Sequence, residues 1–315
     1  MDKKKLGNTN LTTAPIVFGC NVFGWTLDEN ESFRMLDELV GMGLNTLDTA
    51  DVYSSWVPGN KGGESETIIG KWLKQSGNRD KVNIITKVGS DMGQGHKDIG
   101  RKYIAEAVEA SLRRLQIDHI DLYLTHWDDE RTPVEETLGA YAELIKAGKV
   151  GAIGASNLSP ERLQESLDAS KKEGLPKYEV FQPEYNLLER EGYESGLAEI
   201  CTKENLGVIS YFSLASGFLT GKYRTKDDFD KSVRGGGMNK YLDERGLKIL
   251  KSLDELAAKH SVSQAAIALG WLINSDLVTA PIASATKSSH LKAFREAISL
   301  RLETEDVELL DKASS

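Results

Sequence analysis

Four polar residues of the chain stand where short apolar runs end, and their side chains suit one another chemically. Asp48, Lys87 and His126 each end or follow such a run, and Tyr53 lies five residues beyond Asp48. A tyrosine keeps its proton at neutral pH, and a neighbouring ammonium group moves its pKa toward the operating pH by stabilising the phenolate. We expect Lys87 to act in this way on Tyr53, with Asp48 holding the ammonium. His126 would orient a substrate oxygen, so the set suits protonation of a carbonyl oxygen as hydride reaches its carbon.

Taken singly, each of these residues has an ordinary structural explanation. An aspartate after a strand commonly caps a turn, and a loop tyrosine is usually a partly buried anchor. A lysine there is typically solvated, and a lone histidine is more often structural than catalytic. The occurrence of all four residues at corresponding strand ends favours a functional site, because a barrel of parallel strands brings the ends of its strands together at one face.

Three tryptophans are candidates for a substrate pocket beside these residues. Trp25, Trp56 and Trp127 occupy loops that follow the first, second and fourth strands expected below. Scattered tryptophans are usually packing residues, but here they would wall a pocket that stacks on a sugar or an aryl aldehyde. No metal site is expected, because the five histidines show no pairing at ligand spacing and Cys20 lies far from Cys201.

The elements that must position these residues alternate between strand and helix. Eight short apolar runs, rich in β-branched and aromatic residues, are typical of strands buried on both faces. They are Ile16–Phe18, Leu44–Leu47, Val82–Thr86, Ile120–Thr125, Val150–Ala155, Tyr178–Gln182, Gly207–Tyr211 and Leu277–Ile282. Between them lie amphipathic stretches; the one over 101–115 places Ile104, Val108, Leu112 and Leu115 on one face. The alternation favours a closed (β/α)8 TIM barrel of the α/β class, with residues 1–315 as one domain.

Turn and cap signals complete this prediction. Gly7–Asn10 is expected to turn an N-terminal β-hairpin before the first strand. Thr132-Pro133-Val134-Glu135 is interpreted as a capping box that opens a helix through Lys146, and Ser159-Pro160 as the start of the next helix. The charged, glycine-rich stretch 224–240 is long for a connection and is either a functional loop or a disordered one.

A Rossmann domain is the rival architecture, since it also alternates strands and helices. Its fingerprint needs a glycine-rich turn after a strand and before a helix. The glycine cluster of this chain, Gly148, Gly151 and Gly154, runs from a helix end into a strand. The order is reversed, and the barrel is therefore favoured.

Composition narrows the classes of function. The 315 residues include 39 Lys and Arg against 48 Asp and Glu, a formal net charge of −9. This balance argues against binding to a nucleic-acid backbone, although it leaves room for a small cationic pocket that takes a phosphate-bearing cofactor. No apolar segment follows the N-terminal lysines, and no run of about 18 apolar residues occurs. Neither a signal peptide nor a membrane span is expected, and a cytoplasmic location is predicted.

Longer motifs, in order along nearly the whole chain, resemble those of the aldo-keto reductase family. The first group is Asn45-Thr-Leu-Asp48-Thr-Ala-Asp51-Val-Tyr53 with Gly63-Glu64-Ser65-Glu66 downstream, then Ile85-Thr-Lys87 and Asp121-Leu-Tyr-Leu-Thr-His126. The second group is Gly151-Ala-Ile-Gly-Ala-Ser156-Asn157, Phe181-Gln182-Pro183-Glu184-Tyr185-Asn186 and Tyr211-Phe-Ser-Leu-Ala-Ser-Gly217-Phe-Leu-Thr-Gly221-Lys222-Tyr223.

The resemblance implies a barrel oxidoreductase that interconverts a carbonyl and an alcohol with a nicotinamide cofactor. By this resemblance, the catalytic residues of the family correspond to Asp48, Tyr53, Lys87 and His126, and Tyr53 would be the general acid in reduction and the general base in oxidation. The implied cofactor-binding residues are Ser156, Asn157 and Gln182 at the carboxamide, Tyr211 under the nicotinamide ring, Ser213, Leu214, Gly217 and Lys222 at the pyrophosphate, Arg234 closing over the cofactor, and also Asn21 and Asp48.

At the adenosine end the chain departs from the family pattern. Relatives commonly carry Gly-Ala-Ser-x-x-x-Gln-x-x-x-Asn after the eighth strand, and here Phe294 replaces the asparagine that touches adenine. Four residues of this segment can still bind: Ser284, Thr286, Lys287 and His290, with Lys287 or His290 facing a 2′-phosphate. NADP(H) is therefore the predicted cofactor and NAD(H) the alternative. The structural alternative is a capped helix start with no adenosine contact.

Two other functions compete with carbonyl reduction. One is a regulatory or redox-sensing subunit with a bound nicotinamide cofactor, as in the potassium-channel β subunits that share this fold. The other is a Schiff-base aldolase barrel with Lys87 as nucleophile. The predicted partner in the leading hypothesis is a small-molecule carbonyl or alcohol substrate, with no nucleic acid and no membrane; no oligomeric state is predicted.

Overall fold

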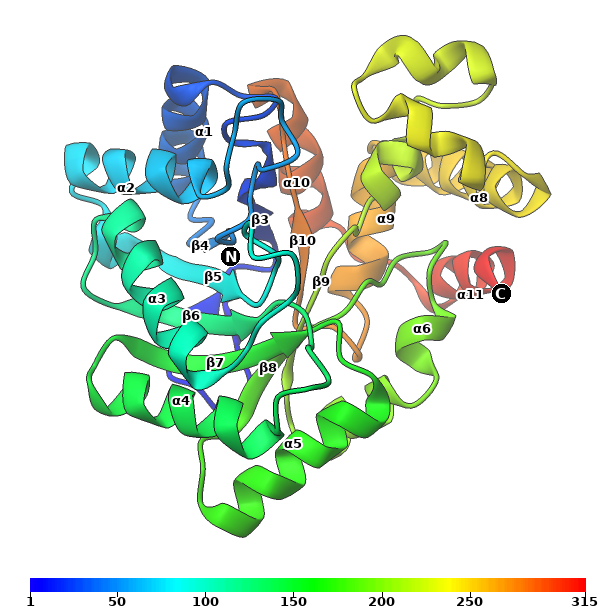
Figure 1. The fold of residues 1–315 in the computed structure, drawn as a ribbon. Helices are drawn as coiled ribbons and strands as arrows, with labels where there is room; N and C mark the ends of the chain where they lie inside the picture. Colours follow the sequence, from blue (N-terminus) through cyan, green and yellow to red (C-terminus); the bar gives the residue numbers. More distant parts are fainter.

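Eight parallel strands close into a barrel in the computed structural model, which describes residues 1–315 (Figure 1). Each strand pairs with its neighbours in the sequence, and the last strand pairs with the first. The barrel strands are β3 (Val17–Gly19), β4 (Thr46–Asp48), β5 (Asn83–Val88), β6 (Ile120–Thr125), β7 (Val150–Ser156), β8 (Tyr178–Gln182), β9 (Gly207–Ser210) and β10 (Ala280–Ala283). All eight predicted runs overlap these strands, and the (β/α)8 barrel is confirmed.

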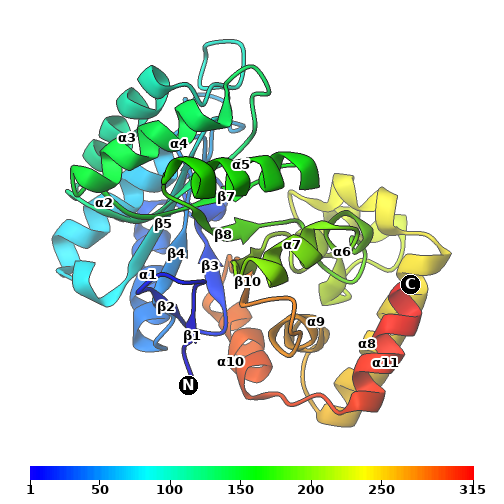
Figure 2. The same ribbon diagram turned by 90° about the horizontal axis from the view of Figure 1, so that it is seen from below.

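Helices surround the barrel on its outside (Figures 1 and 2). The α-helices are α1 (Glu29–Gly41), α2 (Glu64–Ser76), α3 (Arg101–Leu115), α4 (Val134–Lys146), α5 (Pro160–Glu173), α6 (Glu191–Glu194), α7 (Leu197–Lys203), α8 (Glu244–His260), α9 (Gln264–Ile273), α10 (Leu291–Ser299) and α11 (Thr304–Ser314). The short 3-10 helices are η1 (Cys20–Val22), η2 (Arg79–Lys81), η3 (Ala215–Thr220), η4 (Lys226–Lys231), η5 (Gly235–Tyr241) and η6 (Ser288–His290). The predicted apolar face of α3 is buried as expected. None of the helices combines the length and the apolar composition that a membrane-spanning helix requires.

The predicted N-terminal hairpin closes one end of the barrel. Its strands β1 (Lys4–Lys5) and β2 (Thr12–Thr13) pair antiparallel, and Figure 2 shows them beside the N-terminus. Leu6 is fully buried and packs with apolar side chains that point into the barrel, among them Val17 and Ile209. Gly7 follows with φ +57°, and a Cβ there would lie 2.2 Å from the carbonyl oxygen of Glu179. Only glycine allows the chain to pass so close to the start of β8.

One predicted helix cap is wrong. Pro133, not Thr132, occupies the cap position of α4, and no side chain caps that helix. The Thr132 hydroxyl instead donates to a carboxylate oxygen of Asp129 at 3.0 Å. That carboxylate also accepts backbone N–H groups of the preceding loop, so a local turn competes for the hydroxyl. Ser159 caps α5 as predicted.

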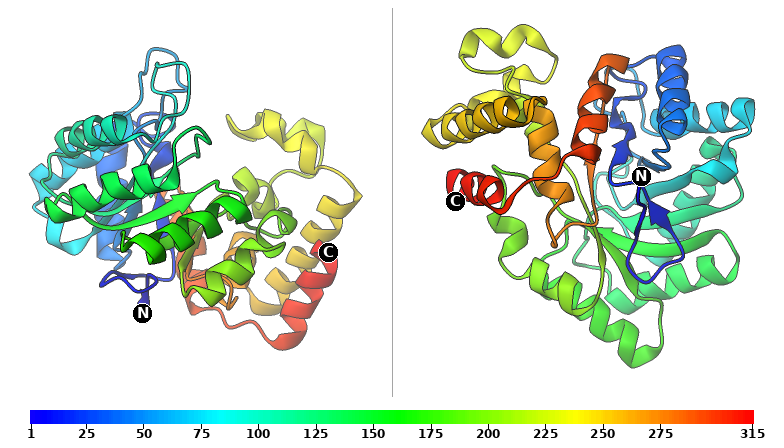
Figure 3. Two further views of the ribbon diagram at one scale, coloured as in Figure 1. Left: turned by 60° about the horizontal axis from the view of Figure 1, so that its bottom comes forward. Right: turned by 180° about the vertical axis from the view of Figure 1, so that it is seen from behind.

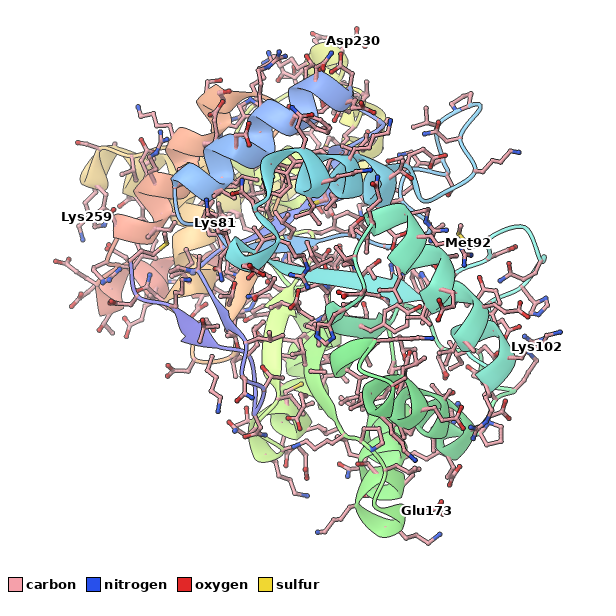
Figure 4. The ribbon with its side chains drawn as sticks, turned by 90° about the vertical axis from the view of Figure 1, so that its left-hand side faces the viewer. Lys81, Met92, Lys102, Glu173, Asp230 and Lys259 are labelled. Carbon is pink, nitrogen blue, oxygen red and sulfur yellow. The ribbon has the colours of Figure 1, made fainter.

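The opposite end of the barrel carries the longer connections. Figure 4 marks both ends: Lys81 precedes β5 at the hairpin end, and Met92 lies in the loop after β5. The stretch predicted to be a functional or disordered loop is ordered as η4 and η5, and it projects beyond α8 and α9 (Figure 3). Residues 231–234 of this stretch line the cavity described next.

Candidate active site

The C-terminal ends of the barrel strands surround a cavity of about 1060 Å³. It receives side chains from β4, β7, β8 and β10 and from the loops after nearly every strand, as expected for this architecture. Among the residues predicted to be functional, the lining contains Asn21, Asp48, Tyr53, Trp56, His126, Trp127, Ser156, Asn157, Gln182, Tyr211, Ser213, Leu214, Gly217, Lys222, Arg234, Ser284, Thr286, Lys287 and His290. Two predicted residues, Trp25 and Lys87, lie behind the lining.

Lys87 is completely buried at the floor of the cavity, and its ammonium group has three partners. It donates to Asp48 Oδ2 at 2.8 Å, to the backbone oxygen of Thr49 at 2.7 Å and to Tyr53 Oη at 3.1 Å. A lysine ammonium has three N–H donors, so all are used. Because Tyr53 accepts this hydrogen bond, its own hydroxyl proton is directed elsewhere. The other oxygen of Asp48 accepts from Gln182 Nε2 at 2.9 Å, which fixes the carboxylate.

Burial and neighbouring charges compete in setting the pKa values of Lys87 and Tyr53. Burial lowers the pKa of Lys87, but Asp48 and Tyr53 together outweigh it and hold that pKa above its ordinary value. Burial also raises the pKa of Tyr53, and the opposing effect of Lys87 does not bring it below the ordinary value. Lys87 lowers the pKa of Tyr53 as expected, but burial outweighs this effect and the net pKa lies above the ordinary value. The nearby Asp48 charge raises the Tyr53 pKa as well, and this cancels part of the lysine's effect.

His126 faces Tyr53 across the floor, with ring centres 6.0 Å apart. Its Nδ1 is hydrogen-bonded to Ser90 Oγ at 3.0 Å, and its backbone carbonyl accepts from Asn157 Nδ2 at 2.8 Å. Burial, with smaller contributions from Lys87 and Lys97, lowers the pKa of His126 well below its usual range. The imidazole is therefore neutral at physiological pH and can present Nε2 to the cavity.

The residues predicted at the carboxamide form a connected hydrogen-bond network at the ends of β7 and β8. Ser156 Oγ donates to the backbone oxygen of Gln182 at 2.8 Å, and Asn157 Nδ2 donates to Ser156 Oγ at 3.0 Å. The Tyr211 hydroxyl donates to Asn157 Oδ1 at 2.8 Å. This bond fixes the position of the Tyr211 ring on the cavity wall. Asn157 has φ +54°, a conformation that asparagine tolerates better than most residues.

The segment predicted at the pyrophosphate curves around the cavity after β9. Gly217 has φ +100°, and a Cβ there would lie 3.3 Å from Lys222 Nζ. The Ser213 hydroxyl donates to the backbone oxygen of Ser210 at 3.0 Å, so it holds the turn. Arg234 reaches into this region from the loop before η5, and its buried Nη2 has no hydrogen-bond partner. The cluster therefore offers cationic groups to an anion in the cavity.

The adenosine-end residues also line the cavity, and two of them have internal partners: Ser284, and His290, whose Nδ1 accepts from the backbone N–H of Thr286 at 3.4 Å. Ser284 Oγ donates to the backbone oxygen of Gly19 at 2.7 Å and lies 2.8 Å from Asn21 Oδ1. Lys287 and His290 present charged or polar groups, and Phe294 is buried with its ring centre 6.5 Å from that of Phe18. Phe294 thus packs as a core residue while its edge forms part of the wall.

The tryptophans occupy different layers of the rim. Trp56 and Trp127 line the cavity and are 46% and 38% exposed. Trp25 lies behind Trp56, with ring centres 5.7 Å apart, and carries the Arg234 guanidinium 4.8 Å from its own ring centre. Trp25 therefore supports the rim and the 224–240 loop, and it does not line the pocket as the sequence interpretation expected.

Among the residues that sequence reasoning missed, three bear directly on the chemistry of the cavity. Ser90 holds His126, Phe212 adds an exposed ring next to Tyr211, and Glu184 adds a carboxylate. Burial raises the pKa of Glu184, with Glu189 adding to the rise. Glu184 lies two residues beyond Gln182, and its place in that motif is the one signal that pointed to it.

Comparison of the whole sequence with known protein families agrees with this geometry. The model of the aldo/keto reductase family matches residues 15–315. This chain belongs to that family. The resemblance drawn from the motifs is confirmed, and as an aldo-keto reductase the protein is an oxidoreductase whose family generally uses nicotinamide cofactors.

Individual relatives cover nearly the whole of this aldo-keto reductase. It is 33% identical over 317 residues to the aldo-keto reductase YhdN of Bacillus subtilis, with 97% of this chain and 91% of the relative covered. It is 32% identical over 289 residues to an L-glyceraldehyde 3-phosphate reductase of Escherichia coli, covering 88% of this chain and 82% of the relative. It is 30% identical over 306 residues to a probable voltage-gated potassium channel subunit beta of Arabidopsis thaliana, covering 95% and 91%.

Proposed function

We propose that this aldo-keto reductase is an NADP(H)-dependent enzyme that reduces an aldehyde or ketone to an alcohol, with Tyr53 as the general acid. One observation carries the proposal: a tyrosine at the cavity floor accepts a hydrogen bond from a buried lysine whose charge is balanced by Asp48. This arrangement leaves one hydroxyl proton free for transfer. We also propose a cytoplasmic location.

The cavity residues suit a nicotinamide dinucleotide. The buried, unpartnered Nη2 of Arg234 is a donor that lacks an acceptor, and an anionic ligand would supply one. Lys222 and Lys287 lie on the same cavity wall, near His290, whose pKa burial and these two lysines lower. A pyrophosphate fits this donor set, and Lys287 with His290 favours a 2′-phosphate and hence NADP(H) over NAD(H). Ser156, Asn157 and Gln182 would hold the carboxamide against Tyr211.

The proton step follows from the contacts of Tyr53. A bound nicotinamide would supply the hydride that reaches the substrate's carbonyl carbon. Tyr53, a phenol across the physiological range because burial raises its pKa, donates its proton to the carbonyl oxygen. The phenolate that forms is stabilised by the Lys87 ammonium at 3.1 Å. In the direction of alcohol oxidation the same phenolate accepts the proton.

His126 and the aromatic rim position the substrate. The neutral imidazole, held by Ser90, presents Nε2 to the carbonyl oxygen and donates when Nε2 carries its hydrogen. Trp56 lies 5.8 Å from Tyr53 between ring centres, and Trp127 lies 6.0 Å from His126. These rings supply an apolar surface for a sugar or aryl body attached to the carbonyl.

The contacts of Lys87 argue against the Schiff-base alternative. A nucleophilic lysine must lose its proton and reach a carbonyl carbon. Lys87 is fully buried behind the lining, all three N–H groups have acceptors, and its pKa is raised. The same geometry that makes it a poor nucleophile makes it a good stabiliser of a phenolate.

Substitution of the proton donor tests the proposal. In Tyr53→Phe, NADPH-dependent reduction of aldehydes, followed by loss of nicotinamide absorbance, should fall about a thousandfold. NADPH affinity, followed by fluorescence quenching, should change little. Tyr178→Phe is the matched control, because its hydroxyl is buried against Thr125 away from the cavity. Wild-type rates in Tyr53→Phe would refute the assignment, and NADPH binding without turnover of any carbonyl in the wild type would favour a regulatory subunit.

A further inference from the structure

Glu184 is the one carboxylate of the cavity lining that has no hydrogen-bond partner. The other three are engaged: Glu31 with the backbone N–H of Asp28, Asp48 with Lys87 and Gln182, and Glu296 with Ser263 and Lys292. No ion pair involves Glu184 either. A half-buried carboxylate that accepts nothing from the protein is free to accept from a ligand.

The backbone directs Glu184 toward the catalytic end of the cavity. Side chains alternate along extended backbone, and Gln182 points inward to Asp48 while Tyr185 packs outside against Tyr193 and Trp271. Glu184 shares the inward side with Gln182 and lies about 7 Å further along the strand direction. It also forms a bridge pair with Tyr211. Its carboxylate therefore faces the space above the floor, where the body of a substrate would lie rather than its carbonyl.

The charges around this space are distributed unequally. The lining near Tyr53 and His126 is made of rings, Trp56, Trp127 and Phe212, together with Glu184. The lining lysines Lys222, Lys287 and Lys292 follow β9 and β10, and Lys231 and Arg234 belong to the 224–240 loop. The Arg234 guanidinium lies over Trp25, behind Trp56. Two rim lysines stand outside the lining. Lys97 lies over the Trp127 ring, and Lys240 lies 4.0 Å from Glu189 and close enough to Glu184 for its charge to lower the pKa of that carboxyl.

From this arrangement we infer that Glu184 is a specificity-determining residue that selects neutral hydroxylated carbonyl compounds and rejects anionic ones such as phosphorylated aldehydes. The inference rests on the proposed function. A substrate hydroxyl near the carbonyl donates to the unpartnered carboxylate, and the aromatic rings cover its C–H groups. A phosphate in the same space meets a like charge, and the rim lysines beside this space, Lys97 and Lys240, stand outside the lining. The substrate class would then differ from the one in the name of the Escherichia coli relative.

The magnitude follows from Coulomb's law. A doubly charged phosphate about 7 Å from a carboxylate, at an effective dielectric constant of about 60, is disfavoured by roughly tenfold in kcat/KM. Glu184→Gln keeps the shape and an acceptor oxygen but removes the charge. Glu184→Leu removes the acceptor as well.

The test compares three aldehydes with NADPH: glyceraldehyde, glyceraldehyde 3-phosphate and benzaldehyde. The wild type should prefer glyceraldehyde to its phosphate by at least about tenfold, and Glu184→Gln should reduce that ratio by about tenfold by raising kcat/KM for the phosphate. Glu184→Leu should lower kcat/KM for glyceraldehyde about fivefold by removing one hydrogen bond. Benzaldehyde has neither group, so its kcat/KM should change less than twofold in both variants.

The control variant is Glu189→Gln, which removes a rim carboxylate that does not line the cavity. It should leave the ratio unchanged. A ratio that stays the same in Glu184→Gln while benzaldehyde is still reduced overturns the inference and leaves the proposed function intact. A wild type that prefers the phosphate also overturns it. Absence of reduction of all three aldehydes by a protein that binds NADPH overturns both.

Discussion

Asp51 provides the sharpest thermodynamic prediction because its buried carboxyl group has no hydrogen-bond partner, and it lies in the sequence between Asp48 and Tyr53, two proposed catalytic residues. It is 2% exposed, and neither carboxyl oxygen has a hydrogen-bond partner. Burial, with Glu66 adding a smaller contribution and Arg114 opposing it, raises the pKa of Asp51 to about 8. The change to test is Asp51→Asn, which keeps the shape and removes the titration.

The sign follows from proton linkage. In the unfolded chain this carboxyl loses its proton near pH 4, whereas the folded protein keeps it to about pH 8. Across that window the folded state binds more protons, so stability falls as pH rises, by at most about 1.4 kcal/mol per pH unit. From pH 5 to pH 8 the free energy of unfolding should lose about 3 kcal/mol through Asp51 alone. Asp51→Asn does not titrate and should lack this slope.

Calorimetric melting between pH 5 and pH 8 measures the difference. The two proteins should have similar Tm values at pH 5, and the variant should melt about 5 °C above the wild type at pH 8. Asp118→Asn, an exposed site without hydrogen bonds from its side chain, is the matched control and should follow the wild type. Parallel pH profiles for the wild type and Asp51→Asn would refute the argument, because they would mean that Asp51 is ionised or partnered in the folded protein.

Three further predictions concern the candidate active site and the N-terminal hairpin that closes the other end of the barrel. Ser90→Ala should lower kcat about tenfold without changing NADPH affinity, since it releases Nδ1 of His126; an unchanged kcat would count against that role. Asn157→Ala and Tyr211→Ala should each weaken NADPH binding about tenfold by fluorescence quenching, and unchanged affinity in both would place the nicotinamide elsewhere. Gly7→Ala should lower the free energy of unfolding by about 3 kcal/mol in denaturant titration, because a Cβ would clash at 2.2 Å with a backbone oxygen.

The order of the strands and the positions of the proposed catalytic residues could be predicted because both depend on local pattern. Buried parallel strands are continuous apolar runs, and a polar residue that ends such a run marks the functional face of the barrel. Asp48, Lys87 and His126 were found in this way, and Tyr53 was found in the loop five residues beyond Asp48. The structure brings the four residues within hydrogen-bond or ring contact.

Other features depended on competition between neighbours that no local pattern records. Thr132 has the residue type and spacing of a cap, but Asp129 takes its hydroxyl. Trp25 follows a strand end as Trp56 does, yet one ring lies behind the other. In the sequence, Glu184 cannot be distinguished from a glutamate on the protein surface. Only the fold shows that its side chain lines the cavity, which is the basis of the role proposed for it.

The sequence by itself therefore determined the barrel, the family and the chemical types at the strand ends, since these follow from periodicity and residue identity. Only the tertiary structure decided the protonation and exposure of those groups. Tyr53 illustrates the difference: a nearby lysine alone would lower its pKa, but burial and the Asp48 charge act in the opposite direction and raise it. Desolvation depends on every atom packed around a group, and that sum exists only in the folded chain.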